Sequence, residues 1–449
     1  MAHTPAHGDR DARTPTPART WLLGGLFAST LAFAPSVHAD GSPTDQPSLD
    51  LDRAVSLALA NNPALALAGW DERAQAERAT HAGAAKNPAL GVELEDALGT
   101  GAFGGLDNAQ LTLRLSQRLS LRDVRGVERR LAEVLRDRAS AETRVLRTEI
   151  ATATARQFIH VLADQERLGV ARERAELCER VLASARERVR QGAASTSDEQ
   201  RAAIARARAR LAVEHAEHEL AASRQRLAAQ WGETRPSFGA VTGDLFARPA
   251  MRSLAELEGR VSEQPYMRRL DHDRSVRETE RLVEEARRAP GLEVSVGGRR
   301  HEGLDAVGLV VGAALELPVF DNNAGPVAAA RVREAQLADA ERALAAQTAA
   351  ELFGLYQELL HATTELDLLE REILPSAEAM EATVAQGVRV GRHNQLEWLD
   401  AQRTLVELRL ERIEKAEELQ RYHVAIEKLA GPSPRAEGRS HAAPGDPHE

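Results

Sequence analysis

The sequence predicts a mainly α-helical protein with a small β part, in which one unit of helical hairpins and strands is duplicated. Three observations lead to this fold class. Aromatic residues make up only 3% of the chain, whereas Ala, Leu, Arg and Glu are abundant, a composition typical of long helices. The helical pattern gives way twice to short stretches of alternating apolar and polar residues. Glycines and prolines also recur in the same order in both halves of the chain.

The first expected element is a secretory signal peptide over residues 1–39. Three arginines precede an apolar run over 21–34, which is too short to span a bilayer as a helix. The small residues of Val37-x-Ala39 suit cleavage, so the exported chain would begin near Asp40. No later stretch reaches about 18 consecutive apolar residues, so any membrane span would have to be made of strands.

The rest of the chain is predicted to hold two copies of one unit, over 40–232 and 253–432. A linker with Pro and Gly residues, 233–252, would join them, and 433–449 would form a disordered tail. Three glycines of the first copy recur 199 positions later: Gly126 matches Gly325, Gly192 matches Gly391, and Gly232 matches Gly431. Landmarks at a constant offset over so long a stretch indicate a duplication.

Each copy is expected to open with two helices. The second helix would begin at Pro63 or Pro265, because the first turn of a helix does not need the N–H that proline lacks. It would end before Pro88 or Pro290, because the residue before a proline avoids the helical conformation.

Two strands should follow in each copy, because apolar and polar residues alternate there. The expected ranges are about 90–96 and 109–118 in the first copy, and about 292–298 and 306–317 in the second. Gly-rich loops over 99–105 and 297–303 would connect the strands of each pair.

A very long helix should come after the strands, over about 127–190 in the first copy and about 326–388 in the second. Turns at Gly192 and Gly391 would send a shorter helix back in each copy. Pro375 lies within the second long helix and should kink or break it, because proline lacks an N–H and clashes with the preceding turn.

These segments resemble the TolC-like outer-membrane efflux channel family, and most of all its CzcC-like heavy-metal-efflux branch. The resemblance covers roughly 48–432. Besides the two glycine turns, it rests on "LDRAVSLALANNPAL" (51–65), "KNPALGVELED" (86–96), "LTLRLSQRL" (111–119) and "LELPVFDNNAG" (315–325). One departure is "SLRDVRG" (120–126), where the branch usually has a Gly-Gly-Lys-Arg-like turn.

Four strands alone cannot close a barrel, and open edges in lipid would leave N–H and C=O groups without partners. The resemblance implies a homotrimer with a 12-stranded β-barrel in outer-membrane lipid and an α-helical tunnel in the periplasm. Its partners would be a periplasmic adaptor and an inner-membrane pump driven by protons. The implied function is a passive exit duct for heavy-metal cations, without a cofactor or enzymatic activity.

Other functions remain open at this point. The duct could serve drug or polypeptide export, since the pump sets selectivity. A periplasmic adaptor also has long helical hairpins. A periplasmic metal-binding protein would need several convergent ligands, and His215-x-x-His218 has a helical spacing that could hold a transition metal. Without a membrane, the strands could form a small soluble sheet on a helical bundle. The net charge of −10 argues against a nucleic-acid partner.

The resemblance also places functional residues near the glycine turns. Asp198, Glu397 and Asp400 would face the lumen at the periplasmic entrance and form a ring of carboxylates that attracts cations. These acids could instead simply complement the dipoles of the helices that they begin.

Two further sets of residues lie at the turns. Val388 and His393 occupy positions where some family channels have a Tyr and an Arg that lock the entrance, so that lock is not expected here. Gly192, Val390 and Gly391 match the adaptor-docking motif, although glycine also commonly ends a helix.

Overall fold

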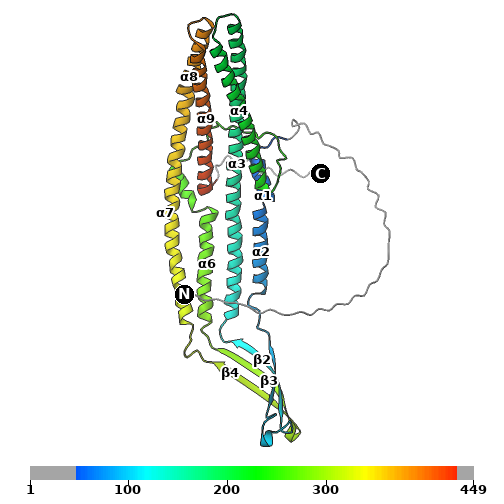
Figure 1. Ribbon diagram of the computed structural model, residues 1–449. Coiled ribbons are helices and arrows are strands. Elements are labelled where there is room, and N and C mark those ends of the chain that lie inside the picture. The colour runs from blue at the N-terminus through cyan, green and yellow to red at the C-terminus, as the bar shows by residue number, and fades with distance from the viewer. Residues whose placement is uncertain (1–46, 432–449) are drawn as a thin grey trace, which may run out of the picture. The chain divides into compact units, whose positions relative to one another are not determined.

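Helices dominate the computed structural model, which describes residues 47–431 (Figure 1). They accompany one four-stranded antiparallel sheet, so the predicted fold class is confirmed. Among these described residues, no helix is both long and apolar enough to cross a membrane. The expected signal peptide, 1–39, and the expected tail, 433–449, lie outside the described part of the chain.

Two short helices open the described chain. Helix α1 (Leu51–Asn61) begins where the Asp50 carboxylate accepts a hydrogen bond from a first-turn N–H. Helix α2 (Pro63–His81) follows after Asn62, which caps it with its side-chain oxygen. The side-chain amide of Asn62 also donates to the Gln230 carbonyl at 2.7 Å. Gln230 lies just after the helix over 196–228, so this bond connects the start of α2 to the end of that helix.

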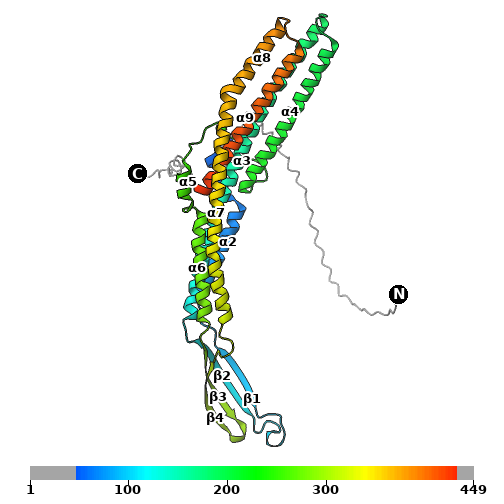
Figure 2. The same ribbon diagram turned by 90° about the vertical axis from the view of Figure 1, so that its left-hand side faces the viewer.

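A long helical hairpin follows the strands in each half of the chain. In the first, α3 (Val124–Arg190) extends over 67 residues and α4 (Thr196–Ala228) returns beside it. The second half has α5 (Leu254–Val261), α6 (Pro265–Ala286), α7 (Ala324–Leu368), α8 (Leu374–Arg389) and α9 (Gln395–Ala430). In both views the hairpin turns lie at the end of the helices that is remote from the sheet (Figures 1 and 2).

The second long helix is divided at the predicted place. A π-helical segment, Leu369–Ile373, separates α7 from α8, and Pro375 lies in the first turn of α8. The proline ring would clash with the carbonyl of Arg371 in a regular α-helix. A π segment widens the helix locally by one residue and thereby absorbs this conflict.

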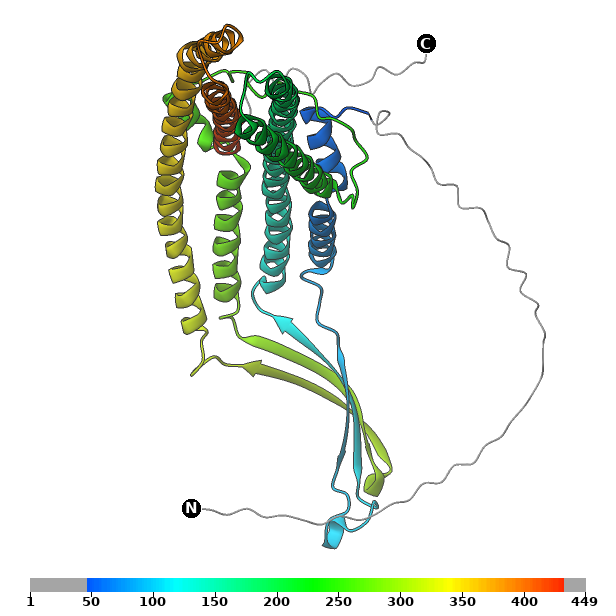
Figure 3. The ribbon, with the colours of Figure 1, turned by 45° about the horizontal axis from the view of Figure 1, so that its top comes forward.

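Two helices from each half of the chain lie in one layer. Figure 3 shows α2, α3, α6 and α7 side by side in this order, and their packing agrees with it. Beyond this layer, toward the hairpin turns, α3 packs against α4 on one side and α9 on the other. Helices α2 and α4 therefore lie along one margin of the described chain, and α7 and α8 lie along the opposite margin.

The sheet has the order β1-β2-β3-β4, with strands β1 (Ala89–Glu95), β2 (Gln110–Ser120), β3 (Gly291–His301) and β4 (Ala306–Glu316). The two halves meet where β2 pairs with β3, while β1 and β4 form the edges. Strand β3 extends to His301, beyond its expected end at about 298, and so includes most of the range that the sequence pattern placed in a loop. A Cβ atom on Gly297 would lie 2.4 Å from the Leu113 carbonyl oxygen, so only glycine fits this close approach.

The sheet has one apolar face and one polar face. The pairing register aligns Val92, Leu113 and Leu309 in one row across the sheet, and all three side chains are exposed. The neighbouring row contains Thr112 and Arg299, which point to the other face. An exposed apolar face on a sheet needs a covering environment, because so large an apolar surface is unfavourable in water.

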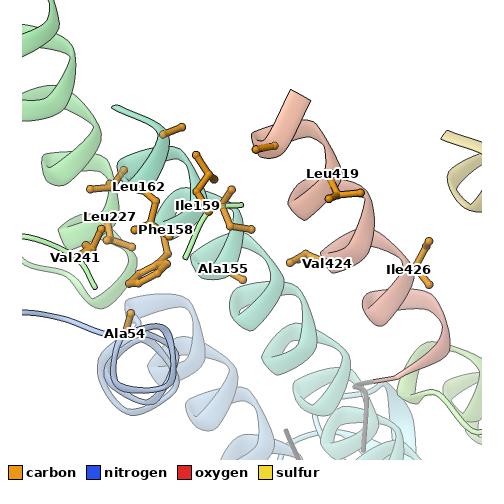
Figure 4. Close-up of a cluster of buried hydrophobic side chains, with 14 of the residues drawn as sticks. Ala54, Ala155, Phe158, Ile159, Leu162, Leu227, Val241, Leu419, Val424 and Ile426 are labelled. Atoms are coloured by element: carbon orange, nitrogen blue, oxygen red, sulfur yellow. The ribbon is translucent and has the colours of Figure 1, made fainter. Parts of the chain in front are cut away.

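The main hydrophobic core lies where α1, α3, α4, α7 and α9 meet. Phe158 is only 2% exposed and lies among Ala54, Leu227 and Val241 (Figure 4). Leu419 of α9 belongs to the same cluster, so this core joins the two halves of the chain. Truncating such a buried aromatic side chain to alanine typically costs about 3–5 kcal/mol.

Candidate functional site

The two hairpin turns have the same backbone geometry. Gly192 has φ +72° and Gly391 has φ +75°, the left-handed region that favours glycine. In both turns the residue after the glycine donates its N–H to the carbonyl five residues back, at 2.8 Å. The glycines thus end α3 and α8 as helix C-caps. No atom lies within 4 Å of the position that a Cβ would take on either glycine, so both turns present open backbone.

Asp198 stabilises the start of α4. Its carboxylate accepts hydrogen bonds from the N–H and the hydroxyl of Ser195, at 3.2 and 2.8 Å, and the Ser195 hydroxyl accepts from the Asp198 N–H. These bonds hold the pKa of Asp198 below its ordinary value, because they favour the charged form. The residue therefore completes a capping box.

Glu397 and Asp400 lie in the first turns of α9, on the other hairpin from Asp198. The Asn394 side chain caps the helix by accepting from the Glu397 N–H at 2.9 Å, and its amide donates back to the Glu397 carboxylate at 3.1 Å. Asp400 is exposed, one turn further along the same face of the helix. The structure thus groups Glu397 with Asp400, while Asp198 occupies the equivalent end of α4.

The two residues at the gate positions differ in their surroundings. Val388 is buried in the last turn of α8. The His393 ring lies against Gly387, where an added Cβ would approach it to 2.1 Å, and its Nδ1 lies 2.5 Å from Glu397 Oε2. The turn therefore needs glycine at position 387 to accommodate the histidine. Val390, beside Gly391, is exposed.

The histidine pair His215 and His218 is exposed on α4, and His218 lies 3.9 Å from Glu214. Within residues 47–431, no three His, Cys, Asp or Glu side chains are grouped so that they could hold a metal ion. Cys178 is buried in α3, and this burial raises the pKa of its thiol. None of these residues marks a catalytic centre.

The polar face of the sheet holds a cluster that sequence reasoning missed. Arg299 of β3 lies 2.7 Å from the Glu95 carboxylate of β1, and it donates to Thr112 and Gln110 of β2 at 2.9 and 3.0 Å. One side chain thus spans three strands. Alternation shows that these residues share a face, but only the register shows that they are neighbours.

A second missed cluster joins α3 to α9. Glu417 accepts from Arg167 at 2.6 Å and lies 2.8 Å from Nδ1 of His160, and Arg167 also donates to Asp164 at 2.8 Å. The carboxylates are the most buried members, with side chains 10% exposed for Glu417 and 5% for Asp164. Buried charges are stable only when they are paired in this way.

The same contacts shift the ionisation of two members. The hydrogen bond to Glu417 raises the pKa of His160, against the opposing effect of burial. Burial alone would raise the pKa of Glu417, but the hydrogen bonds from His160 and Arg167 outweigh it and hold that pKa below its ordinary value. The cluster therefore fixes charged groups at the junction of the two halves.

Comparison with known proteins identifies a family domain in this chain and several similar proteins. Residues 54–233 match the family model described as outer membrane efflux protein. The chain is 29% identical over 369 residues to the cobalt-zinc-cadmium resistance protein CzcC of Cupriavidus metallidurans, which covers 81% of this chain and 85% of that protein. It is 30% identical over 285 residues to the nickel and cobalt resistance protein CnrC of the same organism, covering 63% of this chain and 66% of the relative.

A solved structure extends the comparison to the whole fold. The outer-membrane channel OprN superposes with a TM-score of 0.68 at 19% identity, covering 92% of this chain and 99% of that one. Residues 54–233 therefore carry an outer membrane efflux protein domain, and the chain has the fold of TolC-like outer-membrane channels and is similar to the heavy-metal resistance protein CzcC.

Proposed function

We propose that this protein is the outer-membrane channel of a tripartite efflux system that exports heavy-metal cations. The observation that carries this proposal is the similarity to CzcC over 81% of the chain, together with the channel fold. The protein is a passive duct and not an enzyme, as is typical of the family. Its transport energy comes from its partners, a periplasmic adaptor and a proton-driven inner-membrane pump.

The functional unit is a homotrimer. Within one chain, strands β1 and β4 are sheet edges, and an edge in lipid would leave its N–H and C=O groups without partners. Pairing β4 of one copy with β1 of the next removes every edge, and three copies give a barrel of 12 strands. The exposed apolar face, with Leu113 and Leu309, then contacts lipid.

The polar face of the sheet then lines the pore. Arg299 and Glu95 neutralise each other there, so this part of the lumen is polar without a large excess of one charge. An interior of paired charges and polar groups is typical of water-filled barrels. It provides a path for hydrated ions and imposes little selection on them.

Selection for cations is stronger at the periplasmic entrance. Asp198, Glu397 and Asp400 lie beside the hairpin turns, and three copies of each would place nine carboxylates around the opening. Clustered carboxylates raise the local concentration of cations. Helix-capping contacts support this role, because they hold the carboxylates of Asp198 and Glu397 in position.

The adaptor docks at the open backbone of the turns. Gly192 and Gly391 leave space for close approach of a partner helix, and the exposed Val390 supplies an apolar contact. In this scheme the two turns of each chain offer two similar docking points.

Deletion of the gene from its host tests the metal substrate. We expect the deletion to reduce tolerance to Zn²⁺, Co²⁺ and Cd²⁺ and to raise the cellular metal content. The intact gene should reverse both effects. Tolerance to uncharged drugs serves as the control and should stay unchanged. Loss of drug tolerance with normal metal tolerance would contradict metal export and favour a drug duct.

A further inference from the structure

One arginine connects the two halves of the chain near the hairpin turns. Arg409 of α9 lies 2.9 Å from Glu173 of α3 and 3.4 Å from Glu378 of α8. Glu378 belongs to the same hairpin as Arg409, whereas Glu173 belongs to the hairpin of the other half. The arginine therefore holds its own hairpin together and also binds the neighbouring hairpin.

The duplication repeats all three residue types. The matched glycines of the two halves are 199 positions apart, and by the same offset Arg409 corresponds to Arg210 and Glu378 corresponds to Glu179. Arg206 chiefly, and Arg210 in addition, hold the pKa of Glu179 below its ordinary value. Arg210 thus lies near Glu179, but Arg206 and not Arg210 forms the ion pair with that carboxylate, at 2.6 Å.

The third member recurs in sequence but not in contact. Glu173 corresponds to Glu372, which lies in the π-helical segment between α7 and α8. Glu372 and Arg210 are both exposed, and neither forms an ion pair with any residue of the described chain. They lie on opposite margins, Arg210 on α4 and Glu372 beside α8.

Helix packing also differs between the two halves of the described chain: contacts that α3 makes within one chain have no equivalent for α7. Helix α3 packs against α6 and α9 of the other half, but α7 has no comparable packing on α2 or α4 within residues 47–431. Phe353 of α7 is 52% exposed, whereas its counterpart Thr154 on α3 is fully buried. Leu67 and Trp70 on α2 and Leu211 on α4 are exposed on the opposite margin. Both margins thus have uncovered apolar side chains.

We propose that Arg210 of one copy pairs with Glu372 of the next copy and so repeats between subunits the contact that Arg409 and Glu173 make within one chain. The α7–α8 margin of each copy packs against the α2–α4 margin of its neighbour. Such head-to-tail contacts close into a ring when every step has the same rotation. The inference rests on the proposed homotrimer and names the surface that builds it.

Site-specific cross-linking tests the pairing. In a Cys178→Ala background, Arg210→Cys and Glu372→Cys are combined, and membranes holding the full-length protein are treated with a bismaleimide that can bridge the two positions. We expect covalent dimers and trimers on a denaturing gel. The matched control combines Arg409→Cys with Glu173→Cys, which should cross-link within one chain and leave the mass of a monomer.

The outcomes separate the pairing from the trimer. Suppose that the variant with Arg210→Cys and Glu372→Cys is a trimer by native mass spectrometry but yields only monomers after cross-linking. That result would overturn the pairing and leave the proposed function intact. A monomer by native mass spectrometry would overturn both.

Charge reversal supplies an independent readout. Arg210→Glu alone and Glu372→Arg alone should each lower the temperature at which the trimer dissociates, and the double variant should recover most of the loss. A double variant no better than the worse single variant would also overturn the pairing.

Discussion

Nδ1 of His160 lies 2.8 Å from Oε1 of Glu417, a contact that joins α3 of the first half to α9 of the second. Arg167 donates to the other oxygen of the same carboxylate. Because Glu417 is almost fully buried, its charge depends on these two partners. The cluster therefore links the stability of the two-hairpin arrangement to the ionisation of a few groups.

Glu417→Gln should destabilise the protein strongly. The change removes the charge that pairs with His160 and Arg167, and breaking a buried ion pair from one side costs roughly 3–5 kcal/mol. Thermal unfolding followed by circular dichroism measures the effect. Glu414→Gln, at an exposed position one turn earlier, is the matched control and should change little. Equal shifts in the two variants would show that the buried cluster adds no stability.

The contribution of His160 should depend on pH. Its pKa is raised above the ordinary 6.5, so its stabilising effect is complete below pH 6.5 and is lost as the pH rises through the folded pKa. The pKa of Glu417 is lowered from 4.5, so its effect is complete above pH 4.5 and is lost as the pH falls through the folded pKa.

His160→Asn should therefore lower the melting temperature most between pH 4.5 and 6.5. The difference from the parent should fade in alkaline solution, where His160 is neutral. Asp164 and Arg167 are the other charged groups that face this site. A difference that does not vary with pH would mean that His160 acts only by packing.

Leu309→Arg should impair assembly in the membrane more than Val310→Arg does. The two residues are neighbours on β4, but strand alternation puts their side chains on opposite faces. An arginine that faces lipid near the bilayer midplane costs about 2–4 kcal/mol, whereas one in the lumen remains in water. The fraction of protein recovered as trimer from outer membranes is the readout. If Val310→Arg were the more harmful change, the assignment of the faces would be inverted.

The double change Glu397→Ala, Asp400→Ala should weaken block by a trivalent cation added from the periplasmic side. Removing six of the nine proposed carboxylates from a trimer lowers the local negative potential. Stability should fall by only about 0.3–1 kcal/mol per residue, the typical value of a charge at a helix terminus. Glu411→Ala, further along α9, is the control. If the trivalent cation blocked the channel current of the double variant as strongly as that of the parent, these acids would serve only as helix caps.

Local patterns made much of the fold predictable. Prolines began α2 and α6, and glycines ended α3 and α8, where the sequence indicated, because the backbone preferences of these residues act within a few positions. The extension of β3 from Arg299 to His301 could not be predicted, since this stretch has no apolar residue that would alternate with polar ones. Its strand conformation depends on pairing with β2 and β4.

Some roles of site residues could likewise be predicted from local sequence, and others could not. The capping role of Asp198 depends on Ser195, three positions away, and could be considered from the sequence. His160 and Glu417 are 257 positions apart, so no local signal could bring them together. The proposed pairing of Arg210 with Glu372 involves a second copy of the chain, so no pattern within the sequence of one copy predicts it.

Single-channel recording tests the central claim, that three copies of this chain form a conducting pore through the outer membrane. Full-length protein, expressed in its host and purified from outer membranes as a trimer, is inserted into a planar bilayer between salt solutions of unequal concentration. We expect discrete current steps and a reversal potential that shows a preference for cations, because the proposed ring of carboxylates would surround the entrance. Trimers that insert but carry no current at any voltage would contradict the proposed channel.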